Sequence, residues 1–578
     1  MIRSSYRSLW LATCWGVLAA HPVGQAFAEP SGPGDRVSLT YTVAIESPAS
    51  QRAEVTAALT GFEPGETDMR WEMRRRFAFV RLPEPLLDGR VRAVAGGHSA
   101  SVERAGPYEW NLAVHGQPEI TLSYVVPLTH RSLDAVAKRD AYEYPYLAPD
   151  HGLLVTPTLF LWPKDIPPTD LRVRFELPAG WKVVSPWRSV GEHEFDPCRR
   201  ESLLNDLVAI GNWHTYEIRV GGFVGTVAIA PGQETLEKTA VDPIRRIVEY
   251  ELELFGRPVE GRYLFVFGRP DTRGMAGSPK TDSMTLSVET GLAEHASKYL
   301  PHLIAHEFFH TWTAALFEMP DELRWVGEGF TDYYAYLVPA RLGLSTWDEF
   351  ATTLAKKMQS CAINPQRGQL ALGAAGKDVF FNDRDAYNLV YDGGLLIAAW
   401  LDRAIRSQGR GETLDDLMRA FNNDPRWTKD DATPSLKQFL NVAEQFTDRT
   451  TAATLERFVT QPYEFDPLLA FAPLGVEIRR EITAPQMGLR ANLDGTRVID
   501  VDASSITYRV GVRANDRFVE INGQPVQSAR EVRAAWRNPV DNRIRVTLER
   551  DGEELKLDEP VPKIEQFIVP ADPWREHG

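Results

Sequence analysis

The stretch HEFFHTW, residues 306–312, places two histidines four positions apart on either side of a glutamate. On an α-helix, residues four apart lie about 40° apart around the axis and about 6 Å apart along it. His306 and His310 can therefore reach one ion, and two neutral imidazoles suit zinc. Glu307 stands one step further round the helix, where a general base can act on a water beside the metal without binding the metal itself. The pattern predicts a hydrolytic zinc site on a helix.

A catalytic zinc ion takes a third protein ligand and keeps one position open. In RWVGEGFTDYYAYL, residues 324–337, Glu328 follows His310 by 18 positions, which lets a second helix return toward the first. Asp332, one helical turn later, is predicted to accept a hydrogen bond from the second ring nitrogen of a ligand histidine. His302 lies on the same stripe as His310 but about 12 Å away along the axis, too far to share one ion. We predict one Zn²⁺ per chain, held by His306, His310 and Glu328.

The length and charge of the chain indicate how many domains it has and which partners are disfavoured. The chain has 578 residues, which suggests three or four domains. Its formal net charge of -15 disfavours nucleic acid as a partner, because phosphate binding requires a basic surface. Cys198 and Cys361 remain once Cys14 is removed with the N-terminal segment, and the sequence leaves open whether they pair.

The N-terminal segment has the pattern of a secretory signal peptide. Arg3 and Arg7 precede the apolar run Leu9–Ala20, and Ala26-Phe27-Ala28 gives a small-x-small cleavage site. We expect a signal peptide over residues 1–28, cleaved after Ala28, with an uncleaved anchor as the alternative. No later apolar run approaches the roughly 18 residues of a membrane span. The mature chain is therefore expected to be periplasmic or secreted, with no membrane span.

Strand and helix patterns divide the rest of the chain into three parts. Alternating and β-branched residues predominate to about residue 220, helical patterns from about 298 to 462, and strand signals return after about 474 with a hairpin turn at Asn522-Gly523. We predict a multidomain α+β protein with an all-β N-terminal domain at 29–220, a mostly α domain carrying the zinc site at 221–473, and a smaller β domain at 474–578.

HLIAHEFFHTW, LRWVGEGFTDYY and this domain order together resemble the glycyl aminopeptidase family of zinc metallopeptidases, relatives of thermolysin and of the aminopeptidase N family. The resemblance implies a thermolysin-like catalytic domain, peptide or protein substrates, the zinc ligands predicted above, and Glu307 as the base. It also implies that a tyrosine stabilises the oxyanion. Tyr391, in YDGG, matches the family's Tyr-x-Lys-Gly stretch, with Gly393 in place of the lysine; Tyr387 is the alternative.

The chain departs from the family where the substrate's free amine would be held. The family's Gly-Gly-Leu-Glu-His stretch corresponds to GMAGSPKTDS, residues 274–283, and Gly277 stands in the position of the acid. Asp282 and Glu289 are the candidates to replace it. Without such a partner, burying an ammonium group is unfavourable. Aminopeptidase activity and internal cleavage with weak amine recognition therefore both remain open.

The C-terminal stretch QMGLRANLDGTRVIDV resembles a PDZ domain, so the third domain is expected to be PDZ-like. In this resemblance Met487, Gly488 and Leu489 form the loop whose backbone N–H groups meet a C-terminal carboxylate, and an adjacent strand edge binds a C-terminal peptide. Three functions remain in view: an exported zinc peptidase, a non-catalytic PDZ-mediated peptide-binding protein with a structural zinc, and a zinc hydrolase acting on other carbonyls. The intact Glu307 favours catalysis.

Overall fold

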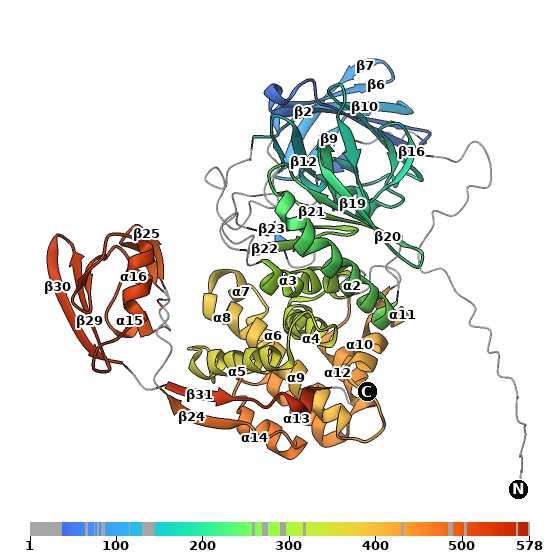
Figure 1. The fold of residues 1–578 in the computed structure, drawn as a ribbon. Helices are drawn as coiled ribbons and strands as arrows, with labels where there is room; N and C mark the ends of the chain where they lie inside the picture. Colours follow the sequence, from blue (N-terminus) through green and yellow to red (C-terminus); the bar gives the residue numbers. More distant parts are fainter. Residues whose placement is uncertain are drawn as a thin grey trace, which may run out of the picture.

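The computed structural model describes residues 37–63, 68–73, 76–77, 80–81, 87–114, 116–129, 145–256, 261–268, 275–288, 296–315, 319–428, 433–483, 489, 491–501, 506–561 and 564–575. The predicted signal peptide lies outside the described residues, as do Glu289, Met487 and Gly488. Figure 1 shows a β domain at the top, a layer of strands and helices below it, and a separate small domain at the side.

The N-terminal domain is built from three main sheets, as its alternating sequence predicts. In β1 (Ser38–Ala44) every second residue is buried, because successive side chains of a strand point to opposite faces. The largest sheet has eight strands in the order β16 (Arg188–Gly191), β17 (Glu194–Asp196), β14 (Asp170–Glu176), β1, β2 (Arg52–Thr60), β10 (Glu119–Pro127), β6 (Asp88–Ala95) and β7 (His98–Ala100). Tyr41, Trp71 and Phe160 are among the residues of its core.

Two four-stranded sheets complete this domain. One has the order β11 (Tyr146–Leu147), β12 (His151–Val155), β18 (Leu207–Gly211) and β15 (Lys182–Val184); the other has β13 (Trp162–Pro163), β3 (Met69–Glu72), β9 (Glu109–Leu112) and β8 (Val102–Gly106). A hairpin of β4 (Arg76–Phe77) and β5 (Val80–Arg81) and the short helix α1 (Arg200–Leu204) are also present.

The second domain begins with a five-stranded sheet in the order β19 (His214–Val220), β20 (Phe223–Ile229), β21 (Arg262–Phe267), β23 (Ser283–Val288) and β22 (Met275–Pro279). The strand at 214–220 falls within the N-terminal domain predicted at 29–220. It instead pairs along its whole length with β20, so it belongs to the second sheet. Its alternation predicts a strand but cannot indicate which sheet the strand joins. β22 runs antiparallel to β23 and is the last strand of this order.

Helices cover this sheet and form the largest core of the molecule. The helices are α2 (Glu237–Phe255), α3 (Ala296–His310), α4 (Thr331–Arg341), α5 (Trp347–Ile363), α6 (Leu372–Ala375), α7 (Val379–Asn382), α8 (Arg384–Asn388), α9 (Gly394–Arg406), α10 (Leu414–Asn422), α11 (Pro425–Thr428), α12 (Leu436–Phe446), α13 (Arg449–Thr460) and α14 (Pro467–Phe471). In the part of the chain that the structure describes, three π-helical segments accompany these helices: η7 (Thr311–Ala315), η9 (Trp325–Phe330) and η10 (Leu389–Gly393).

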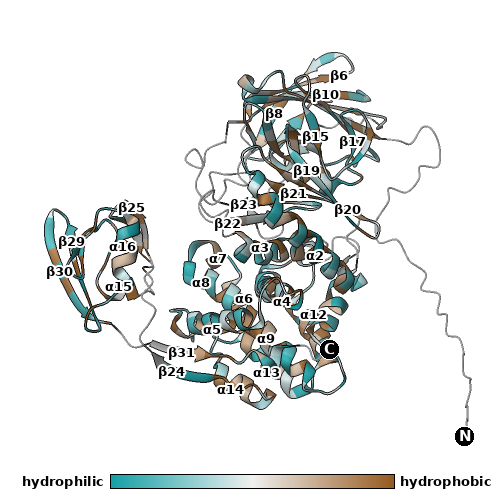
Figure 2. Cartoon of the chain, viewed as in Figure 1, coloured by the Kyte–Doolittle hydropathy of each residue, from teal (hydrophilic) through white to brown (hydrophobic). Residues whose placement is uncertain are grey.

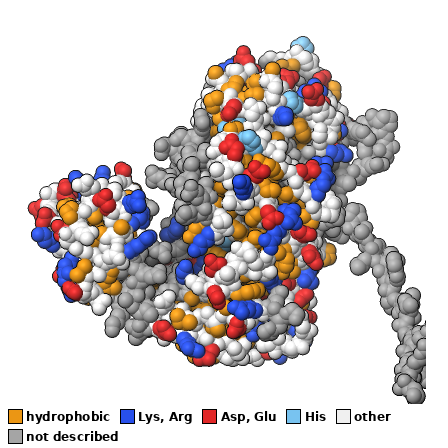
Figure 3. Space-filling model, viewed as in Figure 1, with side chains coloured by type: hydrophobic (Ala, Val, Ile, Leu, Met, Phe, Trp, Pro, Cys, Tyr) orange, Lys and Arg blue, Asp and Glu red, His pale blue; other side chains and the backbone are white. Residues whose placement is uncertain are grey.

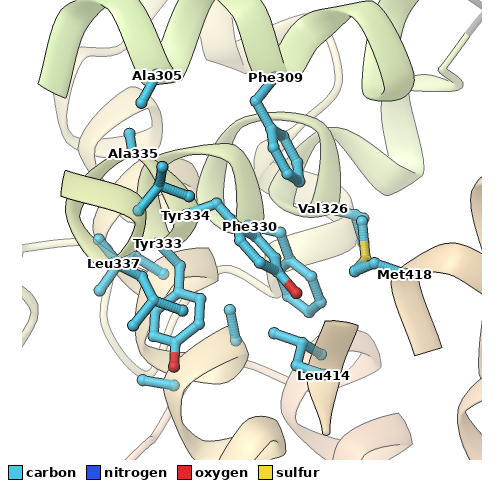
Figure 4. Packing of buried hydrophobic residues seen from close by; sticks show 14 of the residues in the cluster. Ala305, Phe309, Val326, Phe330, Tyr333, Tyr334, Ala335, Leu337, Leu414 and Met418 are labelled. Carbon is cyan, nitrogen blue, oxygen red and sulfur yellow. The ribbon is translucent and has the colours of Figure 1, made fainter. Parts of the chain in front are cut away.

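Two contacts set the positions of the helices around the zinc motif. The Phe309 ring stacks on Tyr334, with centroids 4.7 Å apart and planes 17° apart, which joins α3 to α4 (Figure 4). A side chain at Gly329 would lie 2.4 Å from the Cα atom of Gly394, so only glycine allows η9 and α9 to approach this closely. The sequence places a glycine on each side of Glu328, and one of the two makes this backbone contact.

The C-terminal module has its own core, as the PDZ resemblance predicts. Its sheet has the order β25 (Ala491–Asp494), β26 (Arg497–Val501), β27 (Arg517–Ile521), β29 (Arg543–Arg550) and β30 (Glu553–Pro560), with β28 (Gln524–Pro525) paired to β27, and it carries α15 (Ile506–Arg509) and α16 (Ala529–Trp536). β30 is largely exposed and hydrophilic (Figure 2).

The module is inserted between two strands that belong to the helical domain. β24 (Arg479–Thr483) and β31 (Ile564–Ile568) form a two-stranded sheet, here called the stem, on either side of the module. Phe567, Val569 and Trp574 are buried in the core of the helical domain, and Arg403 donates a hydrogen bond to the Pro573 carbonyl at 2.7 Å. The chain therefore leaves the helices, forms the module, and returns.

Acidic and basic side chains are interspersed over the face of the molecule drawn in Figure 3. Within the described residues, none of the helices is both long and apolar enough to cross a bilayer. Cys198 and Cys361 are not joined by a disulfide: Cys361 is buried in α5, and Cys198 lies in the N-terminal domain.

Candidate metal centre and active site

α3 and η9 bring the three predicted ligands together. The Nε2 atoms of His306 and His310 lie 3.2 Å apart, and the Glu328 Oε2 atom lies 3.6 Å from the first and 3.7 Å from the second. Ligands about 2.1 Å from a tetrahedral zinc ion stand about 3.4 Å from one another. All three residues are buried, and Oε2 of Glu328 has no hydrogen-bond partner among the described residues. The type and the spacing of these three donor atoms suit the binding of a cation.

Asp332 lies behind the histidines, in the first turn of α4. Its Oδ1 atom is 3.4 Å from Nδ1 of His306 and 3.1 Å from Nε2 of His302, while its Oδ2 atom is 3.0 Å from the Lys357 ammonium. His302, His306 and Asp332 thus form a second cluster of donor atoms. The Lys357 ammonium already faces Asp332. Asp332 is therefore better suited to orient the ring of a ligand histidine than to bind a second cation.

The surroundings set the protonation of these groups in different directions. Burial, together with the neighbouring His306, holds the pKa of His310 well below its usual value, so its ring is neutral, as a metal ligand must be. Burial would raise the pKa of Asp332, but Lys357, His302 and His306 hold it well below the usual range. For His306, burial lowers the pKa, as it does for His310. Hydrogen bonds to Asp332 and Glu328 outweigh burial and raise the pKa of His306 to about 10. A metal ion at Nε2 would take the place of that proton.

Glu307 is buried beside the ligands and against the edge strand β22. Burial raises its pKa to about 7, with Glu328 adding to the effect and His306 opposing it. A side chain at Gly277 would come within 2.4 Å of the Glu307 Cγ atom. Gly277 therefore leaves the space that the Glu307 side chain occupies, a physical role that the sequence did not reveal.

Tyr391 lies beside the predicted ligands, and Tyr387 packs on Tyr391. The Tyr391 ring, in η10, lies parallel to the His306 ring within 13°, with centroids 6.2 Å apart. Tyr387 stacks on Tyr391 at 4.6 Å. Burial, with Glu328 and Tyr387, raises the pKa of Tyr391 well above its usual value, so the phenol keeps its proton and can donate a hydrogen bond.

Asp282, one candidate partner for a substrate amine, is engaged elsewhere. Arg199 of the N-terminal domain donates to both its carboxylate oxygens, at 2.8 and 2.9 Å, and the Ser202 hydroxyl also donates to it. This interface position differs from the role considered for it in the sequence analysis. Leu489 is buried in the core of the module, and the other two residues of the proposed carboxylate loop lie outside the described residues.

Lys357 and Asp392 also belong to the site, although no motif in the sequence marks them. The Lys357 ammonium lies 2.6 Å from Oδ1 of Asp392, the residue that follows Tyr391, as well as contacting Asp332. These partners are 25 and 35 positions away in the sequence. No local motif marks Lys357, because only the packing of α5 against η10 and α4 brings the three residues together.

Three segments of the chain match known domain families. Residues 89–212 match the peptidase M61 N-terminal domain, residues 300–397 match M61 glycyl aminopeptidase, and residues 497–550 match a PDZ domain. No curated protein matches the chain.

Solved structures share the fold. A crystal structure of an aminopeptidase N family protein from Idiomarina loihiensis has a TM-score of 0.72 and 15% sequence identity, covering 93% of this chain and 99% of its own. The M1 zinc metallopeptidase from Deinococcus radiodurans has a TM-score of 0.50 and 14% identity, covering 78% of this chain and 99% of its own. At these identities the likeness concerns the fold, and the family matches carry the assignment of the chemistry.

Proposed function

We propose that this M61-type, aminopeptidase-like zinc metallopeptidase is an exported enzyme that cleaves peptide bonds with His306, His310 and Glu328 as ligands of one zinc ion. The observation that supports this most directly is the convergence of two imidazole nitrogens and one carboxylate oxygen at ligand spacing, with Glu307 next to them. When bound, zinc supplies Lewis acidity, which lowers the pKa of a water and polarises a carbonyl. The chain's own residues perform the proton transfers.

Glu307 acts first as a base and then as an acid. It accepts a proton from the attacking water and delivers that proton to the leaving amine. A carboxylate whose pKa is raised to about 7 suits both steps near neutral pH. The Tyr391 phenol donates a hydrogen bond to the oxygen on which negative charge develops. Asp332 holds the His306 ring in the orientation that directs Nε2 toward the metal.

The edge strand β22 is the surface on which the substrate backbone is held. β22 ends the order of the five-stranded sheet, and its Gly277 lies against Glu307. An extended peptide that pairs with this edge would lie alongside the metal ligands. Main-chain pairing of this kind accepts a range of side chains, so it supports a peptide substrate.

Cleavage within peptides is the second candidate function, and two observations favour it. Gly277 leaves no room for an acid beside Glu307, and Asp282 is paired with Arg199. Discrimination for a free amine is therefore expected to be weak. Matched free and N-acetylated peptides test this point: a preference for the free amine above about a hundredfold in kcat/KM, or about 2.7 kcal/mol, contradicts it.

The central test separates metal binding from proton transfer. The mature protein should carry about one zinc per chain, and His310→Ala should lose it. Glu307→Gln should keep the zinc, while kcat falls by about 10²–10⁴-fold because the base is removed. Full activity in Glu307→Gln would refute the mechanism. Zinc-loaded wild-type protein that cleaves no peptide would instead favour the non-catalytic peptide-binding function.

Export and peptide capture belong to the same proposal. The composition of residues 1–28 supports export, and N-terminal sequencing of protein recovered from outside the cytoplasm should begin at Glu29. The PDZ match supports a C-terminal peptide as the ligand of the module.

A further inference from the structure

α5 places one lysine between two parts of the active site. The Lys357 side chain is 19% exposed, and its Nζ atom lies 3.0 Å from Asp332 Oδ2 and 2.6 Å from Asp392 Oδ1. Both carboxylates are more deeply buried than the lysine. A single ammonium thus pairs with two carboxylates, the buried Asp332 on α4 and the partly buried Asp392 in η10.

The two carboxylates serve different groups. Asp332 turns its other oxygen toward Nδ1 of His306 at 3.4 Å, so it acts on a predicted zinc ligand. Asp392 directly follows Tyr391, whose ring lies parallel to that of His306. The ammonium therefore connects the ring that holds the metal to the segment that carries the phenol.

Charge explains why this contact is strong. Burial lowers the pKa of Lys357, but Asp332 and Asp392 outweigh it and hold the pKa well above its usual value, so the side chain stays protonated. Removing the ammonium would leave the carboxylates of Asp332 and Asp392 without their shared cation. An uncompensated buried charge is strongly unfavourable, so either the carboxylates take up protons or η10 moves.

We propose that Lys357 is a positioning residue of the active site, which sets the His306 ring through Asp332 and the Tyr391 phenol through Asp392. This rests on the proposed function, since it assumes that His306 binds zinc and that Tyr391 faces the reacting carbonyl. It adds a shared support for both groups. Loss of Lys357 should weaken metal binding and catalysis together, whereas loss of Asp392 should weaken catalysis alone.

The test measures zinc affinity by chelator competition on the full-length protein, and kcat on the same preparations. Removing the direct partner of a metal-bound histidine costs about 10–100-fold in metal affinity. Lys357→Met, which withdraws the cation that holds that partner, Asp332, should raise the zinc Kd by about 10-fold and should lower kcat. Asp392→Asn should lower kcat and leave the zinc Kd within about threefold. Lys357→Arg, which keeps the charge, should recover most of the zinc affinity. The matched control is Lys356→Met, the same change at the exposed neighbour on α5, which should alter neither quantity.

A zinc Kd in Lys357→Met within about threefold of wild type overturns the proposal. So does a fall in zinc affinity of the same size in Asp392→Asn. Lys357→Gln provides the same comparison if Lys357→Met does not fold. Zinc affinity is measured without substrate, so a wild-type protein that binds zinc and cleaves no peptide would refute the proposed function and leave this test intact.

Discussion

The N-terminal domain meets the catalytic sheet across a buried interface, whereas the C-terminal module is joined to the catalytic helices by the stem. At the first boundary, Arg199 pairs with Asp282, and Asp206 accepts hydrogen bonds from the Asp282 N–H at 2.7 Å and the Ser283 hydroxyl at 2.8 Å. An apolar cluster spans the same boundary: Tyr146, Ala148, Leu153, Val155, Leu207, Ala209, Ala228, Leu264 and Val266. The module instead has a core of its own.

The difference indicates which accessory domain the active site depends on. The strand that carries Gly277 and the strand that begins directly after Asp282 form one sheet with β19, which directly follows the N-terminal domain. The module contributes none of the predicted ligands or proton-transfer residues, but its stem lies against α5. We therefore expect the zinc site to tolerate loss of the module and not loss of the stem or of the N-terminal interface.

The largest effect should come from where the chain is cut. The domain boundary predicted at 473 precedes β24, and truncation there also removes Phe567, Val569 and Trp574 from the helical core. Emptying such positions costs about 2–5 kcal/mol each, so this truncated protein should fail to bind zinc. Excising 484–563 should retain zinc, because Thr483 and Ile564 are register partners that an Asn-Gly turn can join. Zinc content after gel filtration distinguishes the two, and zinc retained by the truncated protein would show that the stem is dispensable.

Breaking the N-terminal interface should have the next largest effect. Asp282→Ala leaves the Arg199 guanidinium without its partner and should lower the free energy of unfolding by about 3–5 kcal/mol. Denaturant unfolding checks this. The control is Asp165→Ala, which breaks the exposed Arg70–Asp165 pair and should change stability little. Equal denaturant midpoints of unfolding for the two variants would argue against a buried charged interface.

The same interface should respond to pH. Burial and the nearby Asp282 raise the pKa of Asp206 well above its unfolded value of about 3.9. Its contribution to stability is therefore complete below about pH 4 and is lost as the pH rises toward the folded pKa, by at most about 1.4 kcal/mol per unit. The melting temperature of wild type relative to Asp206→Asn should fall as the pH rises above about 4. A constant difference would mean that Asp206 is ionised in the folded state throughout.

The smallest effect is expected within the module. Asn515 adopts φ 74°, in the left-handed region that favours glycine. Glycine takes this left-handed conformation without the cost to a Cβ atom, so Asn515→Gly should stabilise the module by up to about 1 kcal/mol. Loss of the Arg497 hydrogen bond to Asn515, at 3.1 Å, opposes the gain. Hydrogen exchange in β26 and β27 measures the effect, and peptidase activity should not change.

The sequence by itself determined the fold class and the spacing of the predicted zinc site. The order of an all-β domain, a helical zinc peptidase domain and a PDZ module is confirmed by the structure and the family matches. The HEFFH spacing places His306 and His310 together because a helix repeats every 3.6 residues. The roles assigned to Glu307, Glu328, Asp332 and Tyr391 remain predictions, although the structure gathers all four at one place.

Only the tertiary structure decided which distant residues share a neighbourhood. Gly277 makes room for Glu307, Asp282 pairs with Arg199, and Lys357 joins Asp332 to Asp392. The same is true of β19, which joins the second sheet, and of the stem, which returns to the helical core. Periodicity reports how a segment folds and which of its faces is buried, but not which other segment covers that face. Contacts between separate elements depend on how their surfaces pack, and no short pattern in the chain encodes that packing.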